Sequence, residues 1–421
     1  MRKNIFSILV AFAGAVALSG CLGSAPSGGG SGGGSGSGTG SGDPGAGSGS
    51  GSGSGNGATG GGAGGSGTPA APKPDPNLAA RTVDYGQALR TAAVKLVGTL
   101  PTLDEQAAVK DAASYAAQID KYLADPRFAL QIKSYYSDMM KMGGTLKAIV
   151  GQNTVTVSLD TAPTFAAELV VNDQPITNLF TATTNSCPTL DAAGKFTDAA
   201  CTVANGQPTV GVLTDPGAMA QFYSNMSFRR ARWLQESFAC TKFPAEYSAK
   251  PVAMGNGQFT SPWPFTSVSG GAGAPINFQD TSSVICANCH TTMNHFAPLL
   301  ANFDAAGVYQ TTIQVHTPTP MTPITKLTDW LPAGETFSWR FGATVKDLTT
   351  LGAAIAADTD VQKCQVQRAW NWAMSKTDIV NDLSIVPDKT IADVMTVFTS
   401  GGMKMKPVLK AIFTADDFVK F

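Results

Sequence analysis

The pentapeptide at residues 286–290 reads Cys286-Ala287-Asn288-Cys289-His290. Two cysteines separated by two residues and followed at once by a histidine are typical of c-type haem attachment, in which both thiols bond to haem vinyl groups and the histidine binds the iron. The 421-residue chain has only seven cysteines and three histidines, so this pattern seldom arises by chance. We therefore expect one covalent haem c, bound by Cys286 and Cys289, with His290 as an iron ligand.

Two other kinds of site could use the same residues. Zinc would take Cys286, Cys289 and His290 as three ligands, but the other histidines are His295 and His316, and no second cysteine pair has the spacing of a zinc finger or ribbon. A redox disulfide would need a strand followed by a helix, as in thioredoxin, and that pattern does not surround the motif. The haem interpretation is favoured over both.

Residues that follow the motif are candidates for the haem pocket. Phe296, Leu299, Leu300 and Phe303 would form an apolar wall that keeps water from the porphyrin. His295 lies only five residues after His290 on the chain. We interpret it as a core or haem-edge histidine rather than as the ligand on the opposite side of the iron.

The second axial ligand should come from a loop that returns over the haem. His316 and Met321 lie in the proline-broken stretch His316-Thr-Pro-Thr-Pro-Met321 and are the candidates, with an ordinary loop role as an equal alternative for each. A methionine ligand raises the reduction potential and a histidine lowers it. Met403 and Met405 are weaker candidates, for which packing at a helix start is the favoured interpretation.

The amino terminus predicts export. Arg2 and Lys3 precede an apolar run over residues 5–18, which is typical of a secretory signal peptide at residues 1–20. The run ends in Leu18-Ser19-Gly20-Cys21, which resembles a bacterial lipobox, so we expect lipidation of Cys21. The alternative is an ordinary signal peptide cut after an alanine such as Ala25.

Residues 21–74 are dominated by glycine and serine and predict a flexible tether. Leu22 follows the lipobox cysteine where lipoproteins kept at the inner membrane usually carry aspartate, which favours the outer membrane, on its periplasmic or its surface face. The net charge of −1 and the lack of a basic patch argue against nucleic acid as a partner. We expect a lipid-anchored protein of the cell envelope.

Four cysteines remain once Cys21 is assigned to the lipid and Cys286 and Cys289 are assigned to the haem. Cys187, Cys201, Cys240 and Cys364 allow three pairings in an oxidising compartment, and buried free thiols are the alternative. We favour Cys187 with Cys201, closing a short loop, and Cys240 with Cys364, joining two distant helices.

Apolar residues at helical spacing predict three amino-terminal helices. The first has a stripe from Leu89 to Leu100, and the second begins with a capping box at Thr102 and Glu105 and runs through Val109 to Tyr122. The third starts at Asp125-Pro126, buries an aromatic face and stops at Gly143-Gly144.

Further along, alternating Thr and Val predict short strands or irregular loops over residues 153–213. A helix near residue 225 carries Arg229, Arg230 and Arg232, for which a solvated or ion-paired face is favoured over contacts with haem propionates. Three more helices are predicted at 362–374, 391–398 and 407–413.

Together these patterns predict a mainly α fold with a small irregular or β layer in the middle. An amino-terminal helical bundle covers residues 75–150, and the irregular or β layer with the arginine-rich helix covers 151–275. A cytochrome c-like haem-binding segment covers 276–357 and a helical segment covers 358–421. No further apolar run reaches the length of a transmembrane helix.

The order of these blocks resembles the planctomycete-type cytochrome c families, whose helical domains surround a single haem-binding segment. The resemblance covers most of residues 80–421. Its matching blocks are Asp125-Pro126-Arg127-Phe128, the Arg229-Arg230 helix leading to Cys240 and Pro244, the haem motif with Asn302-Phe303-Asp304-x-x-Gly307-x-Tyr309, and Cys364-x-x-x-Arg368 with a closing helix ending at Phe418. The resemblance implies haem binding and specifies no substrate.

Electron transfer is the first functional hypothesis: a monohaem c-type lipoprotein that exchanges electrons with redox partner proteins of the cell envelope and is an electron carrier rather than a catalyst. The first alternative is a haem enzyme whose open distal site binds peroxide or a small gas. The second alternative is a surface binding or assembly module in which the haem is structural.

Overall fold

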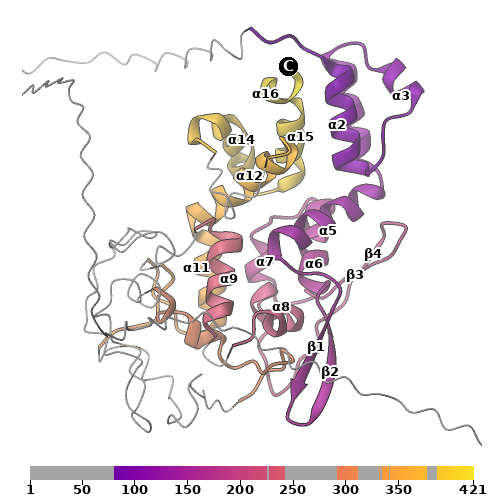
Figure 1. The fold of residues 1–421 in the computed structure, drawn as a ribbon. Coiled ribbons are helices and arrows are strands. Elements are labelled where there is room, and N and C mark those ends of the chain that lie inside the picture. Colours follow the sequence, from indigo (N-terminus) through magenta and orange to yellow (C-terminus); the bar gives the residue numbers. More distant parts are fainter. Residues whose placement is uncertain are drawn as a thin grey trace, which may run out of the picture. The chain divides into compact units, whose positions relative to one another are not determined.

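The structure of the chain, a computed structural model, is built mainly from α-helices (Figure 1). It describes residues 80–224, 227–241, 292–311, 331, 334–340, 342–376 and 386–421. The α-helices of these residues are α2 (Tyr85–Val97), α3 (Leu103–Ala108), α4 (Ala112–Ala124), α5 (Arg127–Met140), α6 (Thr161–Val171), α7 (Asn178–Thr181), α8 (Pro216–Gln221), α9 (Phe228–Phe238), α11 (Leu348–Ala357), α12 (Thr359–Ala373), α14 (Asp388–Ser400), α15 (Met405–Thr414) and α16 (Asp416–Val419). The prediction of a mainly α fold is confirmed.

Short elements lie between the α-helices. They are the 3-10 helices η1 (Gly211–Thr214) and η3 (Ala297–Leu300) and the strands β1 (Thr145–Val150), β2 (Asn153–Ser158), β3 (Thr189–Leu190) and β4 (Phe196–Thr197). Among the described residues, no helix combines the length and the apolar character needed to cross a membrane.

Several predictions concern residues outside the described ranges and stay predictions. They are the signal peptide 1–20, the tether 21–74, the lipid-bearing Cys21, the haem-motif residues Cys286, Cys289 and His290, and the distal candidates His316 and Met321.

Helix α2 forms on the predicted apolar stripe. The carboxylate of Asp84 accepts a hydrogen bond from the backbone N–H of Gln87 at 2.9 Å, which satisfies one of the otherwise free donors of the first turn. Gly98 adopts the left-handed conformation, with φ 75°, and ends the helix. The predicted extension of the stripe to Leu100 is wrong, because the chain leaves the helix at Gly98 and Leu100 is 60% exposed.

The capping box predicted at the start of the next helix is confirmed. The N–H of Glu105 donates to the hydroxyl of Thr102 at 3.2 Å, and the N–H of Thr102 donates to the carboxylate of Glu105 at 2.7 Å. The prediction of a single helix through Val109 is wrong, because the backbone of Val109 is extended and α3 ends before it. A second capping box, formed by Asp111 and Ser114, satisfies the first N–H groups of a new helix, α4.

Helix α5 buries the aromatic face that its sequence predicts. The carboxylate of Asp125 accepts a hydrogen bond from the N–H of Arg127 at 2.8 Å. Lys141, with φ 55°, ends the helix shortly before the predicted stop at Gly143-Gly144. The buried members of the predicted face are Phe128, Ile132, Tyr135, Tyr136 and Met139.

Two hairpins are the only strands in the described part of the chain. Strands β1 and β2 pair antiparallel, from Thr145 opposite Ser158 to Val150 opposite Asn153, and β3 pairs with β4. Short strands in the middle of the chain are therefore confirmed. β1, however, occupies the last six residues of the segment 75–150 that is predicted to be helical.

Helix α6 corrects the prediction of strands or loops over residues 153–213. The Thr and Val residues of the surrounding region suggest strand, but α6 itself contains three alanines against two threonines and two valines. Nearly all of its side chains are buried, and it packs against α5, α7 and α8. Its alanines, leucine and glutamate favour a helix, and the burial of the helix against its neighbours adds to that preference.

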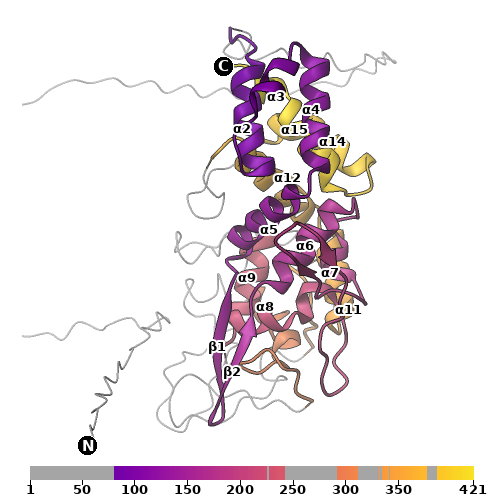
Figure 2. The same cartoon turned by 90° about the vertical axis from the view of Figure 1, so that its right-hand side faces the viewer.

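Helices α12, α14 and α15 match the three predicted near the carboxyl end, while α11 and α16 are additional. Helix α12 lies at the centre of this region, since it packs against α9, α11, α14 and α15 (Figure 2). It is buried on most of its faces although its sequence includes Gln365, Gln367, Arg368 and Asn371. Buried apolar side chains from α2 through α16 form one continuous core.

The last residues of the chain return to the start of the described region, beside α2 (Figure 1). Thr82 and Phe421 exchange both backbone hydrogen bonds, at 3.1 and 3.0 Å, and the N–H of Asp84 donates to the carbonyl of Val419 at 2.9 Å. The start of the described region and the last residues of the chain are therefore joined by backbone hydrogen bonds.

Candidate functional site

The first described stretch of the predicted haem-binding segment runs from Thr292 to residue 311. It passes through η3 and then turns back on itself, so that Phe303 forms an antiparallel bridge with Tyr309. The haem-motif cysteines and His290 immediately precede it in the sequence. We call residues 292–311 the post-motif segment.

The predicted apolar wall lies in the post-motif segment and is buried. Phe296 and Phe303 are 0% and 2% exposed, and Leu299 is half-buried. Phe296 packs edge-to-face on Trp339 with ring centroids 5.0 Å apart, and Phe303 packs on Tyr309 at 5.4 Å. The ring partners are aromatic side chains of the protein itself, and the role of these residues as a wall beside a haem stays a prediction.

Asp304 fixes the turn of the post-motif segment. Its carboxylate accepts hydrogen bonds from the N–H groups of Ala306 and Val308 at 2.9 and 3.0 Å and from the side-chain amide of Gln310 at 3.0 Å. Gly307 has φ 73°, and a Cβ there would collide with the carbonyl of Pro216. This geometry accounts for the Asp-x-x-Gly spacing seen in the sequence.

Arg230 ties the post-motif segment to helix α9. Its side chain is fully buried and donates to the backbone carbonyl of Leu300 at 2.8 Å and to that of Asp304 at 3.1 Å. The same guanidinium donates to the carbonyl of Met219 at 2.9 and 2.6 Å. It also lies over the ring of Phe303, 5.8 Å from its centroid. One side chain thereby joins α8, α9 and the post-motif segment.

The prediction of a solvated or ion-paired side chain is wrong for Arg230. Its guanidinium is buried and donates its hydrogen bonds to backbone carbonyl groups. Burial lowers its pKa to about 9, so the guanidinium stays charged near neutral pH. Backbone carbonyl groups accept its hydrogen bonds, and the charge of Asp304 works against the lowering of the pKa. Arg229 and Arg232 are exposed, as predicted, and Arg232 forms an ion pair with Glu236 at 2.8 Å.

His295 is a core histidine, in agreement with its sequence-based interpretation. It is 4% exposed, its Nε2 lies 3.7 Å from a carboxylate oxygen of Glu335, and its carbonyl accepts from the N–H of Ser338 at 3.0 Å. Met405, the first residue of α15, is buried in the core, and the partly buried Met403 packs against that core, which agrees with packing at a helix start.

The disulfide between Cys240 and Cys364 is present, in the favoured pairing, and joins the end of α9 to α12 across 124 residues. The side chain of Arg368 lies against this bond, with its Nε 3.3 Å from the sulfur of Cys240. Helices α9 and α12 are therefore linked covalently next to an arginine.

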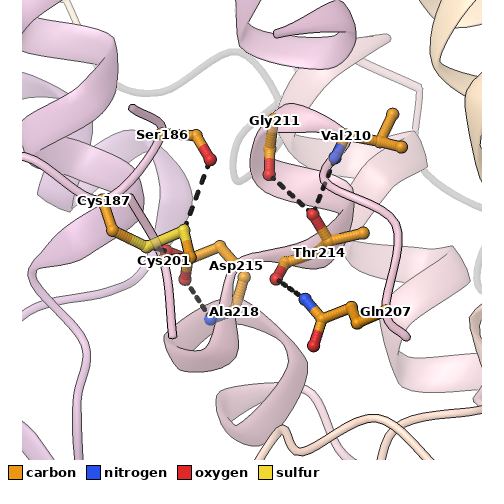
Figure 3. Close-up of a disulfide and its surroundings, with 9 residues drawn as sticks. All are labelled: Ser186, Cys187, Cys201, Gln207, Val210, Gly211, Thr214, Asp215 and Ala218. Carbon is orange, nitrogen blue, oxygen red and sulfur yellow. Dashed lines mark hydrogen bonds between the residues drawn. A yellow bond between two sulfur atoms is a disulfide. The ribbon is translucent and has the colours of Figure 1, made fainter. Parts of the chain in front are cut away.

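The second favoured disulfide, between Cys187 and Cys201, lies beside the buried carboxylate of Asp215 (Figure 3). Asp215 accepts a hydrogen bond from the N–H of Ala218 at 2.7 Å and caps α8. The two sulfurs and the carboxylate lie within 4.8 Å of one another, as metal ligands could. Because both sulfurs are in the disulfide, they lack the thiolates that bind a metal.

Gln235 and Gln365 were missed by sequence reasoning, because a glutamine in a helix carries no signal of function. Both are buried, on α9 and α12, and within the described ranges neither the nitrogen nor the oxygen of either side-chain amide has a hydrogen-bond partner. Buried polar groups without a hydrogen bond are rare in proteins, because each costs roughly 1–3 kcal/mol of stability. These amides are free to bond to a buried ligand or to water.

Comparisons of this chain with protein-family models, with curated proteins and with solved structures find no match. The candidate site is therefore argued from its residues alone.

Proposed function

We propose that this chain is a monohaem c-type cytochrome, lipid-anchored at the bacterial cell envelope, that passes electrons between redox partner proteins. The observation that carries the proposal is the sequence Cys286-x-x-Cys289-His290, in which two thiols and the adjacent imidazole suit covalent haem. The resemblance of the surrounding blocks to the planctomycete-type cytochrome c families supports the same class, with a cytochrome c-like segment set among helices.

In this proposal Cys286 and Cys289 hold the haem through thioether bonds, and His290 binds its iron. The bound haem supplies a centre that takes up and releases single electrons. His316 and Met321 are the candidates for the opposite side of the iron. The unsatisfied amides of Gln235 and Gln365 offer hydrogen bonds to a buried group.

The post-motif segment supports the proposal because its backbone, which follows the haem motif in the sequence, is held by side-chain hydrogen bonds. Arg230 holds the carbonyls of Leu300 and Asp304, and the carboxylate of Asp304 fixes the following turn. A cofactor site is held more reproducibly when the adjacent backbone is locked to secondary structure than when it lies on a free loop.

The disulfides support the expected compartment. Cys187–Cys201 and Cys240–Cys364 suit an oxidising environment outside the cytoplasm. Export through the predicted signal peptide, with a lipid on Cys21, would bring the chain to the compartment where bacteria attach haem c.

Expression with the signal peptide in a bacterial host that matures c-type cytochromes tests the proposal. Intact mass should show one added haem, and the pyridine haemochrome spectrum should be that of haem c. The variant Cys286→Ala with Cys289→Ala should lose both signals. Matched removal of another cysteine pair, Cys187→Ala with Cys201→Ala, should keep them. Wild-type protein without the added mass would contradict the proposal.

The spectrum of the ferric protein separates electron transfer from its first alternative. A low-spin spectrum that changes in Met321→Ala or in His316→Ala would identify the second axial ligand and support an electron carrier. A high-spin spectrum that responds to cyanide or peroxide would favour an enzyme with an open distal site.

A further inference from the structure

The disulfide Cys187–Cys201 closes a loop of the chain that contains the β3–β4 hairpin. Its two sulfur-bearing residues differ in access, since Cys187 is partly exposed and Cys201 is buried. A thiol that attacks this bond from solution would therefore reach the sulfur of Cys187 first. The proposed haem chemistry makes no use of this disulfide.

Each sulfur of the disulfide has its own polar neighbour (Figure 3). The Sγ of Cys187 lies 3.8 Å from a carboxylate oxygen of Asp215. The hydroxyl of Ser186 lies 3.3 Å from the Sγ of Cys201 and donates to it, because a disulfide sulfur carries no proton. When the bond is open, the carboxyl group can exchange a proton with Cys187, and the hydroxyl can stabilise a thiolate on Cys201.

Asp215 has the properties that a proton carrier needs at this position. Its side chain is fully buried, and within the described ranges no cation forms an ion pair with it. Burial raises its pKa to about 6, so the carboxyl group can hold or release a proton near neutral pH. Its distance from the sulfur of Cys187 is short enough for a direct transfer once a thiol forms there.

Other titratable groups lie on the elements that pack against α8 and against the disulfide loop. They are Lys147 of β1, Asp160 before α6, Glu168 of α6, Asp198 of the loop, Arg230 of α9 and Asp304 of the post-motif segment. Strand β2 and η1, which also pack against α8, carry no titratable side chain. Burial and the nearby Asp198 raise the pKa of Glu168 to about 7. Glu168 is therefore the group from which Asp215 must be distinguished.

Backbone hydrogen bonds hold the two ends of the loop together independently of the disulfide. The N–H of Cys187 donates to the carbonyl of Ala199 at 3.1 Å, and β3 pairs with β4 between the two cysteines. The carboxylate of Asp191 accepts from the N–H groups of Ala193 and Lys195, both at 2.9 Å, and fixes the turn of the hairpin. The disulfide can therefore open and close again in a folded chain.

We propose that Cys187–Cys201 is a thiol–disulfide exchange site that accepts two electrons from a dithiol, with Asp215 as its proton carrier. A thiolate of the dithiol attacks the Sγ of Cys187, and Cys201 leaves as a thiolate stabilised by Ser186. The second thiol of the dithiol then attacks the mixed disulfide, and Cys187 leaves and takes a proton from Asp215. The dithiol becomes a disulfide and releases two protons to water. Two protons from water, one of them through Asp215, complete the two thiols of the protein.

Reduction of the full-length, haem-matured protein by dithiothreitol, at constant thiolate concentration and on both sides of pH 6, tests this inference. Rapid alkylation followed by peptide mass mapping gives the rate for each cysteine pair. The rate for Cys187–Cys201 should fall about tenfold as the pH rises through 6, because the ionised carboxylate repels the attacking thiolate and has no proton to supply. Asp215→Asn keeps a side-chain oxygen for the cap of α8 and should lose this fall.

Two controls separate Asp215 from its surroundings. Glu168→Gln removes the other carboxyl group whose pKa is raised toward neutral pH, and this variant should keep the fall in rate. Cys240–Cys364 serves as the reference bond in every variant. An unchanged reduction rate for the reference bond shows that the variant is folded.

Three results would overturn the inference. One is a Cys187–Cys201 bond that opens only together with Cys240–Cys364, as it would through global unfolding. Another is a wild-type rate that does not change through pH 6 at constant thiolate concentration. The third is loss of the fall in Glu168→Gln with its persistence in Asp215→Asn, which would assign the proton to Glu168. Absence of haem from the wild-type protein would refute the proposed function and leave this test intact, since each cysteine is mapped separately.

Discussion

Asp215 shows how burial changes the chemistry of a single residue. Its carboxyl group is fully buried next to the Cys187–Cys201 disulfide, and burial raises its pKa to about 6. The hydrogen bond from the N–H of Ala218 opposes that rise but does not cancel it. The folded protein therefore binds a proton at this site more tightly than the unfolded chain does.

The pH dependence of stability should reveal this carboxyl group. Since its pKa rises from 3.8 unfolded to about 6 folded, its stabilising contribution is complete below pH 3.8 and is lost as the pH rises through 6. Asp215→Asn removes the titration, so its free energy of unfolding should lack a decline of about 3 kcal/mol across this window. Urea unfolding of both proteins at a series of pH values measures the difference. Parallel profiles would contradict the assignment.

The three arginines of α9 illustrate what the sequence leaves undetermined at this scale. Arg229, Arg230 and Arg232 look alike in the sequence, and only Arg230 is buried. Its environment depends on carbonyl groups of Leu300 and Asp304, about seventy residues away in the chain. Local periodicity cannot predict a contact made by backbone atoms of a distant loop.

At the scale of elements, Arg230 makes α9 and the post-motif segment depend on each other. The segment has few regular backbone hydrogen bonds of its own besides η3 and the turn at Asp304. Its carbonyls at Leu300 and Asp304 are satisfied by a side chain from the helix. Loss of that side chain would leave buried acceptors unpaired.

Arg230→Met should therefore destabilise the protein by about 3 kcal/mol or more, because several buried carbonyl groups lose their donor. Arg232→Met changes the same helix at an exposed position and should cost about 0.5 kcal/mol or less. Urea unfolding compares the two variants with the wild-type protein. Equal losses in both would show that the buried hydrogen bonds of Arg230 contribute little.

Helices with a clear apolar stripe and a capping signal could be predicted from the sequence. The face of α5 and the capping box of α3 are examples. Helix α6 was missed because nearly all of its side chains are buried, so it has no alternation of apolar and polar faces to mark a helix. The break at Val109 was missed because the capping side chain of Asp111 competes locally with helix continuation.

At the scale of the whole molecule, covalent links connect segments that are remote in sequence. Cys240–Cys364 spans 124 residues and joins α9 to α12, whereas Cys187–Cys201 spans only 14. The two disulfides together are one of the three pairing schemes that four cysteines permit, and it is the scheme that the sequence analysis favours. A cysteine count limits the possibilities, and the arrangement of the helices confirms the favoured one.

Removal of the long-range disulfide should cost more stability than removal of the short one. In the chain-entropy description, the link across 124 residues restricts the unfolded chain by about 5 kcal/mol and the link across 14 residues by about 3 kcal/mol. Cys240→Ala with Cys364→Ala, compared with Cys187→Ala with Cys201→Ala in urea, measures the order. A larger loss in the short-loop variant would contradict it.

The paired ends of the described region have a consequence for how this unit could be re-engineered. Since Thr82 and Phe421 exchange backbone hydrogen bonds, a linker of a few residues would join the two ends without displacing either. New termini could then be opened at Gly151-Gln152, the exposed turn between β1 and β2. The resulting circular permutant would hold the same contacts in a different chain order.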